Sequence, residues 1–552
     1  MNRTFAYAVL ALGALLCMRG DAACAAALEY HVISANDWLY PDTKIPASPV
    51  KTVDLHSARG GRAGFQLLLR GMSANDPLTC RFEGQPQPEI YQLIDVNVPE
   101  NSGPPCSAIP PDQPTPEYVI RKAPYRVYEA LRPVREGDRA RGETEAFYVS
   151  FRVNPDTAPG PHNGRFRIQA GDQVAEIGVH LTVHDVRIPE QGRLRVTNWF
   201  STEHMARLHK LEPWSEPHWQ MLRRYAQMMR RGRQTDFMPV RPRVKKLGEG
   251  SWEFDFSRTE RMIKMFLDEG FTHIEMPHIA GHDRRKEAVA RFVVNVEGTP
   301  HPGTSHEAYV YLSQYLTAWA NMLRRNGWYD RATQHIVDEP PPAHFGEYRI
   351  MAGTVRKFLP GVPLIDALGE PELDGAVDIW VPLSESYEKA RDAFEAHRRR
   401  GDAIWFYTCC APSGFHLNRF IDTELLRTRL LHWTNWRYRL DGYLHWGLNQ
   451  IIPEQDPFEN TTPPHGPYKD FHLPPGDSHL VYPGEDGPWS SVRFEAMGSG
   501  IEDYELLRIV AAQDEKLADE LCSQLVRTFT DYDATVPGFE AAHRRLLEEA
   551  AK

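Results

Sequence analysis

The feature that most constrains the fold of this chain is the alternation of strand-like and helix-like segments after residue 189. Short apolar runs suited to buried strands recur between amphipathic stretches suited to helices, an order that favours a parallel sheet with crossover helices. The expected strands are Leu194–Trp199, Thr235–Pro239, Thr272–Pro277, Thr333–Val337, Pro363–Ala367, Val377–Pro382, Ala403–Tyr407 and Gly442–Trp446. The expected helices are Trp219–Arg230, Arg258–Asp268, His306–Arg325, Gly346–Phe358, Tyr387–Arg399 and Thr423–Arg439. Eight such units in roughly 250 residues predict a TIM-type (β/α)₈ barrel, which we place at residues 190–490.

A doubly wound open sheet is the alternative architecture for these residues. It is disfavoured because no glycine-rich phosphate-binding fingerprint follows the first expected strand. The weakest unit of the barrel prediction is the segment between the fifth and sixth strands, which is short for a helix.

The regions on either side of the expected barrel have different patterns. Residues 26–189 contain short alternating runs, such as Phe65–Leu69, Phe147–Phe151 and Ile177–Val183, separated by turn-forming Pro, Asn and Gly. Short strands without a convincing helix predict an N-terminal β-sandwich. Residues 491–552 are predicted to be a helical extension beside the barrel.

The N-terminus has the pattern of an export signal. Arg3 precedes an apolar run from Phe5 to Met18, and small residues follow up to an Ala-x-Ala-like site at residues 23–25. We therefore expect residues 1–25 to be a signal peptide and the mature chain to be periplasmic or extracellular. No later segment resembles a membrane span.

Charge and cysteine content narrow the partners further. The formal net charge of -11 disfavours nucleic acid, because binding phosphates needs a basic surface. In an oxidising compartment Cys80 could pair with Cys106, and the adjacent Cys409 and Cys410 are interpreted as two small apolar residues. No C-x-x-C pair indicates structural zinc, and we expect no metal or cofactor. The oligomeric state is not predicted.

The residues most suggestive of chemistry are the adjacent acids Asp338 and Glu339. They stand at the C-terminal end of the fourth expected strand, the face where barrel enzymes hold their active sites. Pro340 disfavours the helical region for Glu339, so the chain is expected to leave the strand extended. Solvated loop acids are the alternative interpretation.

The rest of the expected barrel lacks an obvious second catalytic acid. Retaining glycosidases with two carboxylates hold them about 5–5.5 Å apart, yet the seventh strand ends without one and Glu385 is a poor substitute. The adjacent pair fits substrate-assisted hydrolysis better, in which the substrate's own 2-acetamido oxygen attacks the anomeric carbon. Glu339 would protonate the leaving oxygen and Asp338 would orient the acetamido group.

Aromatic and polar residues near other strand ends are candidates for sugar binding. Trp405, Tyr407, Trp446 and Asn449 stand at or beyond the seventh and eighth strands, where rings stack on sugars and polar groups hold an acetamido group. Barrel core packing is the alternative, above all for Trp405. Weaker candidates of the same kind are Trp199 and Glu203.

His278 and His282 are four residues apart, a spacing that suggests metal binding on a helix. Pro277 breaks any helix there, so the spacing does not place two imidazoles on one face. Hydrogen bonding to substrate, or an ordinary loop position, is the preferred interpretation of His278.

In these stretches the chain resembles glycoside hydrolase family 123, the retaining β-N-acetylgalactosaminidases, and the wider uncharacterised group that shares its catalytic domain. The resembling stretches are His335–Pro340, Trp405–Cys410, Asp441–Asn449, residues 476–484 and Ser491–Leu507. The resemblance implies an N-terminal β-sandwich, a (β/α)₈ barrel, and catalysis by Asp338 and Glu339 in the roles given above. Tyr482, within residues 476–484, is a further candidate for substrate binding. Arg493, Glu495, Glu502 and Asp503 fit either a structural ion-pair network or sugar contacts.

The expected function is that of an exo-acting glycoside hydrolase that releases β-linked N-acetylgalactosamine from glycans or glycolipids. Two alternatives remain open at this point: a glycosidase of the same fold acting on another sugar, and a carbohydrate-binding protein without turnover. The intact acidic pair argues against the second.

Overall fold

The computed structural model of the chain describes residues 28–283, 292–466 and 468–552. The expected signal peptide, residues 1–25, lies outside the described residues. In the described part, no helix is both long enough and apolar enough to cross a membrane.

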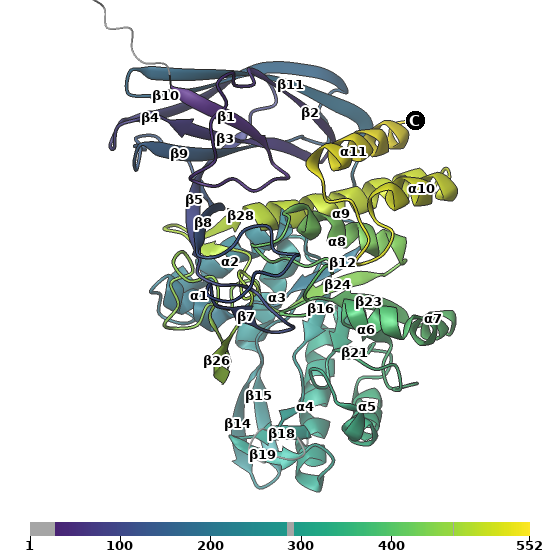
Figure 1. Cartoon of the computed structure of the whole chain (residues 1–552). Coiled ribbons are helices and arrows are strands. Elements are labelled where there is room, and N and C mark those ends of the chain that lie inside the picture. The colour runs from purple at the N-terminus through teal and green to yellow at the C-terminus, as the bar shows by residue number, and fades with distance from the viewer. Residues whose placement is uncertain (1–27, 284–291, 467) are drawn as a thin grey trace, which may run out of the picture.

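The N-terminal region is rich in strands, which form two main sheets (Figure 1). The seven-stranded sheet has the order β1 (Glu29–Ser34), β3 (Arg62–Arg70), β9 (Thr144–Arg152), β5 (Glu89–Val98), β8 (Tyr125–Pro133), β28 (Pro488–Ser491) and β27 (Tyr482–Pro483). The four-stranded sheet has the order β2 (Thr52–Arg59), β11 (Gln173–Arg187), β10 (Gly160–Ala170) and β4 (Leu78–Glu83). A small hairpin joins β6 (Asn101–Ser102) to β7 (Ala108–Ile109). Late residues of the chain thus complete a sheet that its first residues begin.

The two N-terminal sheets share one apolar core. Along β11, Ile177, Val179 and Leu181 are buried while the residues between them are more exposed, which is the period-two pattern of a strand with one face on a core. Phe65 of β3 meets Phe166 of β10 edge to face, with ring centroids 6.0 Å apart. The alternating runs predicted as strands therefore lie within β3, β9 and β11.

All eight strands predicted after residue 189 are present and lie parallel to their neighbours. A five-stranded sheet has the order β12 (Arg195–Asn198), β24 (Gly442–His445), β23 (Ala403–Tyr407), β22 (Ile379–Val381) and β21 (Ile365–Ala367). A three-stranded sheet has the order β13 (Asp236–Phe237), β16 (His273–Met276) and β20 (Ala332–Gln334). The sheets are adjacent at both edges: a parallel bridge joins Gln334 to Leu364, and the Thr235 amide donates to the Val196 carbonyl oxygen (3.0 Å).

Helices follow most of these strands, largely where the sequence predicted them. They are α1 (Thr202–Leu208), α2 (Glu216–Arg231), α3 (Ser257–Asp268), α4 (His306–Arg325), α5 (Phe345–Phe358), α6 (Ser384–Lys389), α7 (Arg391–Arg399) and α8 (Leu426–Arg437), with short 3₁₀ turns at Tyr329–Arg331 and Pro342–His344. The Ser305 hydroxyl caps α4 by accepting from the Ala308 amide (3.2 Å), and Gly327, at φ +69°, follows its end. The predicted helix Tyr387–Arg399 is interrupted at Ala390, and the connection between β21 and β22, residues 368–378, contains no helix.

Three hairpin-like insertions extend from this parallel-sheet region. They pair β14 (Arg243–Gly248) with β15 (Ser251–Asp255), β17 (Gly281–His282) with β18 (Phe292–Val296) and β19 (Thr299–Pro302), and β25 (Pro464–His465) with β26 (Tyr468–His472). The first two project together with α4 at the foot of the molecule in Figure 1. They follow the second and third strands of the series, so they leave the sheet at the end where active sites of parallel folds are built.

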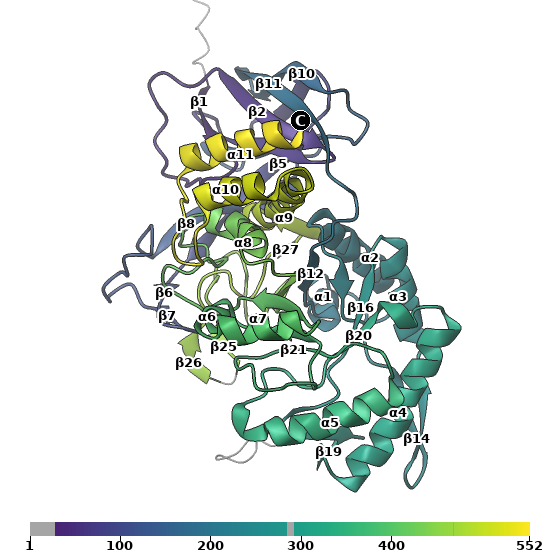
Figure 2. The same cartoon turned by 90° about the vertical axis from the view of Figure 1, so that its right-hand side faces the viewer.

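The C-terminal helices connect the two halves of the molecule. They are α9 (Val492–Ala511), α10 (Glu515–Leu525) and α11 (Val536–Ala550). Helix α9 packs on α8, and α11 packs on α9 and on β2 and β11 of the N-terminal region (Figure 2). The sequence predicted these helices beside the barrel, and α11 lies in addition against the four-stranded sheet.

Buried ion pairs fix α9 to the seven-stranded sheet. Arg493 bonds Glu129 of β8 at 2.7 Å, and both side chains are fully buried. Arg62 of β3 bonds Glu495 at 3.0 Å and Glu502 at 2.9 Å. Further pairs join Arg231 to Glu495, Arg233 to Glu502, and Arg429 to Asp503. The sequence left open whether the four charged residues of α9 contact sugar or form a structural ion-pair network. They form the network: Arg493, Glu495, Glu502 and Asp503.

Candidate active site

Asp338 and Glu339 lie just beyond β20, at the C-terminal edge of the parallel strands, and both are exposed. The backbone bends sharply here, because Glu339 has a φ of +46°. The expected extended exit from the strand is therefore wrong: Pro340 excludes the right-handed helical region, and Glu339 adopts the left-handed one instead. Its amide donates to the Ala367 carbonyl oxygen (3.1 Å), which fastens the bend to the end of β21. Left-handed residues other than glycine are costly and gather at functional sites.

A buried carboxylate holds the backbone that leads into the acidic pair. Asp366 of β21 accepts hydrogen bonds from the amides of Ile336 (2.9 Å) and Val337 (3.4 Å). It also accepts from the Tyr348 hydroxyl (2.6 Å) and from His335 Nδ1 (2.9 Å). Asp366 is completely buried, so these bonds are not exchanged with water. The position of the acidic pair therefore depends on the charge and shape of this one side chain.

His335 lies between two buried carboxylates. Its Nδ1 contacts Asp366, and its Nε2 is 3.7 Å from Glu275 Oε2, while the Trp199 indole donates to the same Glu275 oxygen (2.9 Å). Burial alone would lower the pKa of His335, but its interactions with Asp366 and Glu275 outweigh burial and raise the pKa to about 9. His335 is consequently an imidazolium at neutral pH, with Nδ1 donating to Asp366 and Nε2 facing the Glu275 carboxylate without a hydrogen bond.

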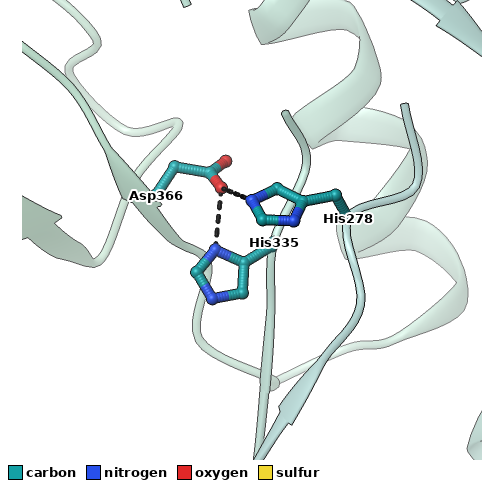
Figure 3. A group of neighbouring side chains, drawn as sticks. All are labelled: His278, His335 and Asp366. Atoms are coloured by element: carbon teal, nitrogen blue, oxygen red, sulfur yellow. Dashed lines mark hydrogen bonds and ion pairs between the residues drawn. The ribbon is translucent and has the colours of Figure 1, made fainter. Parts of the chain in front are cut away.

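His278, His335 and Asp366 also form the group of described residues whose geometry comes nearest to a metal site, with ligand atoms within 4.8 Å of one another. Figure 3 shows the Asp366 carboxylate facing both imidazoles, at 2.9 Å from His335 and 3.8 Å from His278. A metal ligand must be a deprotonated nitrogen, whereas His335 Nδ1 carries a proton and donates a hydrogen bond to Asp366. Burial and then the charge of His335 lower the pKa of His278 well below its usual value. The chemistry of this donor set fits a hydrogen-bonded charge cluster.

An open cleft of about 670 Å³ lies in front of this cluster. Asp338 forms part of its wall, and Trp199, His278, His282 and Gln450 are among the other residues that line it. His282 Nε2 donates to the Asp338 carbonyl oxygen (2.6 Å), so one wall of the cleft helps to hold the bend. The structure thus brings His278, a predicted site residue, and Trp199, a weaker candidate, into one cleft with Asp338.

Tyr407 connects the other member of the pair to β23. Its hydroxyl donates to Glu339 Oε1 at 2.5 Å. Burial, and next the charge of Glu339, raise the pKa of Tyr407 well above its usual value, so the phenol keeps its proton. Tyr407 therefore lies at the end of β23 and contacts Glu339 of the acidic pair, and its role in sugar binding stays a prediction.

Two other predicted sugar-binding residues, Trp405 and Tyr482, are buried in apolar cores. Trp405 is buried among the strands beneath Tyr407, because its side chain faces the sheet interior and packs on Gly442. Tyr482 is fully buried between Phe458 and His479 in the core of the N-terminal sheet. Neither residue reaches the cleft, so both predictions are corrected to core packing.

Asn449 is fully buried and braces a loop instead of facing the cleft. Its Oδ1 accepts from the Ser201 amide (2.8 Å), and its Nδ2 donates to the Ser201 carbonyl oxygen (3.1 Å). Ser201 belongs to the loop after β12 that lines the cleft. Asn449 therefore acts on the site through the loop that it holds, and the prediction of direct sugar contact is corrected.

Trp446 remains partly exposed beyond β24, and its indole donates to Asp477 Oδ2 (3.3 Å). Burial raises the pKa of Asp477 to about 6, against the lowering effect of the nearby Arg419.

Glu385, the weak candidate for a second catalytic acid, lies on α6. Its carboxylate forms an ion pair with Lys389 at 2.7 Å.

Sequence reasoning missed Asp366, Glu275 and Asp477. The first two had a usable signal, because each is a carboxylate inside an expected strand of the parallel sheet, and a charge buried there needs a partner. Asp477 lies in residues 476–484, a stretch recognised by resemblance without a role being assigned to this residue.

Comparison with known proteins finds a family model that matches part of the chain and a solved structure of similar fold. Residues 242–510 match the model of the "Glycoside hydrolase 123, catalytic domain". The solved structure of a family 123 glycoside hydrolase from Clostridium perfringens, studied for glycolipid glycan hydrolysis, matches with a TM-score of 0.74 and 15% identity over 95% of this chain and 98% of that one. A termite-gut GH10 xylanase with a bacterial Ig-like domain matches with a TM-score of only 0.34 and 11% identity, over 65% of this chain and 90% of that one. Comparison with curated protein sequences gives no match.

Proposed function

Because this chain is a glycoside hydrolase that carries the catalytic domain of family 123, we propose that it is a retaining exo-enzyme releasing β-linked N-acetylgalactosamine by substrate-assisted catalysis. The observation that carries the proposal is the placement of the acidic pair. Asp338 lines the open cleft, and Glu339 turns from it to meet the Tyr407 hydroxyl at 2.5 Å. Two adjacent carboxylates thus have different surroundings, which suits two different roles.

In the first proposed step the acetamido oxygen of the bound sugar attacks the anomeric carbon. The glycosidic carbon–oxygen bond breaks, and Glu339 gives its proton to the leaving oxygen. Asp338 accepts the acetamido N–H and stabilises the positive charge of the oxazolinium ring. In the second step Glu339 takes a proton from a water molecule, and the oxygen of that water attacks the anomeric carbon. The oxazolinium ring opens, and the released sugar keeps its anomeric configuration.

Tyr407 supports this division of roles. In the free enzyme its hydroxyl donates to Glu339, and it stands at the sheet edge where an acetamido oxygen would approach. We propose that Tyr407 turns to that oxygen when the sugar binds. Glu339 is then released to hold a proton for the leaving group.

The cleft suits a single terminal sugar with its aglycone outside. Trp199 presents an indole at its wall, perpendicular to the His278 ring at a centroid distance of 5.3 Å, and His278 offers a neutral imidazole. Aromatic faces and neutral polar groups are what sugars require. We propose glycans or glycolipids as the source of the sugar, the latter because the Clostridium perfringens relative is described for glycolipid glycan hydrolysis.

We further propose that the two parallel sheets together form the (β/α)₈ barrel and that the N-terminal sheets form a β-sandwich. The bridge at Gln334 and the bond at Thr235 join the sheets at both edges, and the first and last strands, β12 and β24, pair with each other. An open doubly wound sheet would leave two free edges. Export of the chain after removal of residues 1–25 is also proposed, and detection of the mature N-terminus in a periplasmic or culture fraction would test it.

The test is a panel of chromogenic β-glycosides that includes the N-acetylgalactosaminide, the N-acetylglucosaminide and sugars without a 2-acetamido group. We expect release from the N-acetylgalactosaminide, loss of about 10²- to 10⁴-fold in Glu339→Gln, and no loss in the control Glu385→Gln, whose carboxylate pairs with Lys389. We also expect inhibition by a thiazoline mimic of the oxazoline. Faster release from the N-acetylglucosaminide would show that the enzyme acts on N-acetylglucosamine instead of N-acetylgalactosamine. Turnover of sugars lacking the acetamido group would reject the mechanism, and binding without turnover would indicate a carbohydrate-binding protein.

A further inference from the structure

Three cysteines gather beside the candidate active site although they are far apart in the sequence. Cys106 stands in the hairpin between β6 and β7, and Cys409 and Cys410 lie two and three residues beyond the end of β23. The Cys106 amide donates to the Cys410 carbonyl oxygen (2.9 Å), and the sulfurs of Cys409 and Cys410 are 3.9 Å apart. All three are thiols in the structure. The predicted partner of Cys106 was Cys80, but Cys106 lies instead against this pair.

Buried hydrogen bonds hold the β6–β7 hairpin against the segment that follows β23. Asp422 accepts from the Ser102 amide (2.6 Å) and hydroxyl (2.7 Å), and from Asn101 Nδ2 (3.2 Å). Asp422 is fully buried, so it holds the hairpin firmly. At the tip, Cys106 has a φ of +61°, a strained conformation that directs this residue toward Cys410. The position of Cys106 beside Cys410 is thus fixed by the hydrogen bonds of the hairpin to Asp422 and to the Cys410 carbonyl oxygen.

The environment activates one thiol of the three. The neighbouring Cys409 thiol, and next the Cys410 thiol, lower the pKa of Cys106, and the pKa values of both neighbours rise. The thiolate is the nucleophile in sulfur exchange. Cys106 is also partly exposed, so a small reagent can reach it. Burial, by contrast, raises the pKa of Cys80 and of Cys522 to about 12 each.

A metal site is the other function that three thiols could serve. Among the described residues, the group of metal-ligand type whose atoms all lie within 4.8 Å of one another is the histidine and aspartate cluster of Figure 3, and it includes none of these cysteines. A metal bound by three thiolates would require all three sulfurs at about that spacing or closer. The observed arrangement therefore favours pairwise sulfur chemistry.

We propose that Cys106, Cys409 and Cys410 form a thiol–disulfide exchange site whose oxidation ties the β6–β7 hairpin to the end of β23. The oxidant is a small-molecule disulfide. The Cys106 thiolate attacks one of its sulfurs, and the other sulfur leaves as a thiolate. The Cys409 or Cys410 sulfur then attacks Cys106, loses its proton, and releases the second small thiol. Two protein thiols are oxidised and one disulfide is reduced to two thiols, so electrons and protons balance.

The proposed disulfide would lie close to the proposed catalytic acid Glu339. Cys409 is two residues beyond Tyr407, and both pack in the same apolar cluster at the end of β23. Since the Tyr407 hydroxyl bonds Glu339, a covalent tie after β23 limits movement of the residue that contacts the proposed acid. The third cysteine remains a thiol that can take over the bond by exchange.

The test uses the full reduced chain, oxidised glutathione, and peptide mapping by mass spectrometry. We expect a disulfide between Cys106 and Cys409 or Cys410, its loss in Cys106→Ser, and its retention in the controls Cys80→Ser and Cys522→Ser. A disulfide limited to Cys409 and Cys410, a cross-link to Cys80, or persistent glutathione on Cys106 would overturn the proposal.

A second measurement does not depend on the cross-link. Alkylation of Cys106 by iodoacetamide should change less than about twofold between pH 5 and 8, because a thiol with a lowered pKa is already ionised there. An ordinary thiol would react about tenfold faster for each pH unit in this range. Such a tenfold rise at Cys106 would overturn its assignment as the activated thiol. Neither readout uses sugar hydrolysis, so both stand or fall independently of the proposed function.

Discussion

His335 should make the stability of this protein depend on pH in a direction that can be stated in advance. Folding raises the pKa of this imidazole from 6.5 to about 9, since interactions with Asp366 and Glu275 outweigh its burial. A raised pKa stabilises the folded state fully below the unfolded value, and this stabilisation is lost as the pH rises through about 9. The shift corresponds to about 3 kcal/mol at 1.36 kcal/mol per pH unit. The free energy of unfolding should thus lose about 3 kcal/mol from this group between pH 6 and 9.5.

The assay compares the wild-type chain with His335→Gln, which fills similar space without titrating. Urea unfolding followed by tryptophan fluorescence at several pH values gives the difference between the two proteins, in which contributions from titrating groups that do not contact His335 cancel. We expect the wild-type advantage to be largest near pH 6 and to shrink by about 3 kcal/mol by pH 9.5. Parallel curves, with a difference constant to within about 0.5 kcal/mol, would refute the assignment of a charged His335. An advantage that grows with pH would refute it equally.

Three further substitutions test separate contacts. Tyr407→Phe removes the hydroxyl that donates to Glu339 and should lower kcat/KM about 10- to 100-fold with little change in melting temperature, since the ring stays packed. Asn449→Ala leaves the Ser201 backbone without two buried partners, and we expect about 2–3 kcal/mol lower stability in thermal unfolding together with a raised KM. Arg493→Met leaves Glu129 buried and unpaired, at about 3–5 kcal/mol by denaturant unfolding, while the kcat of the folded fraction stays unchanged. Adding Glu129→Gln to that variant should recover part of the loss, and no recovery would contradict the ion-pair explanation.

The fold of the parallel-strand region was predictable because its signals are local. Strand-like runs and amphipathic helices alternate along the chain, and each element carries its own pattern of buried positions. The predicted helix His306–Arg325 has the observed bounds of α4, where a serine cap and a following glycine fix both ends. The interruption of the helix at Ala390 and the pairing of β28 with β8 were not predictable, because neither depends on a local pattern.

The site was predictable only in part, for a related reason. The position of Asp338 and Glu339 beyond a strand follows from the order of the sequence, and so does the approach of Tyr407 from the same edge of the sheet. The depth of a side chain does not follow from that order. Side chains of a strand alternate in direction, so Trp405 and Tyr407, two residues apart, point to the same face of β23. Tertiary packing alone decided that Trp405 is buried below the sheet edge while Tyr407 reaches Glu339.

The sequence by itself determined the order of elements, the resemblance to a glycosidase family and the location of the acidic pair, because periodicity and adjacent residues are properties of a linear chain. Only the tertiary structure decided how the pair is held. The left-handed turn at Glu339, the Asp366 carboxylate beneath it and the cysteines beside Tyr407 each join residues from separate strands or loops. Their energies depend on burial, since charges and thiols behave differently once water is removed, and burial exists only after the chain has folded.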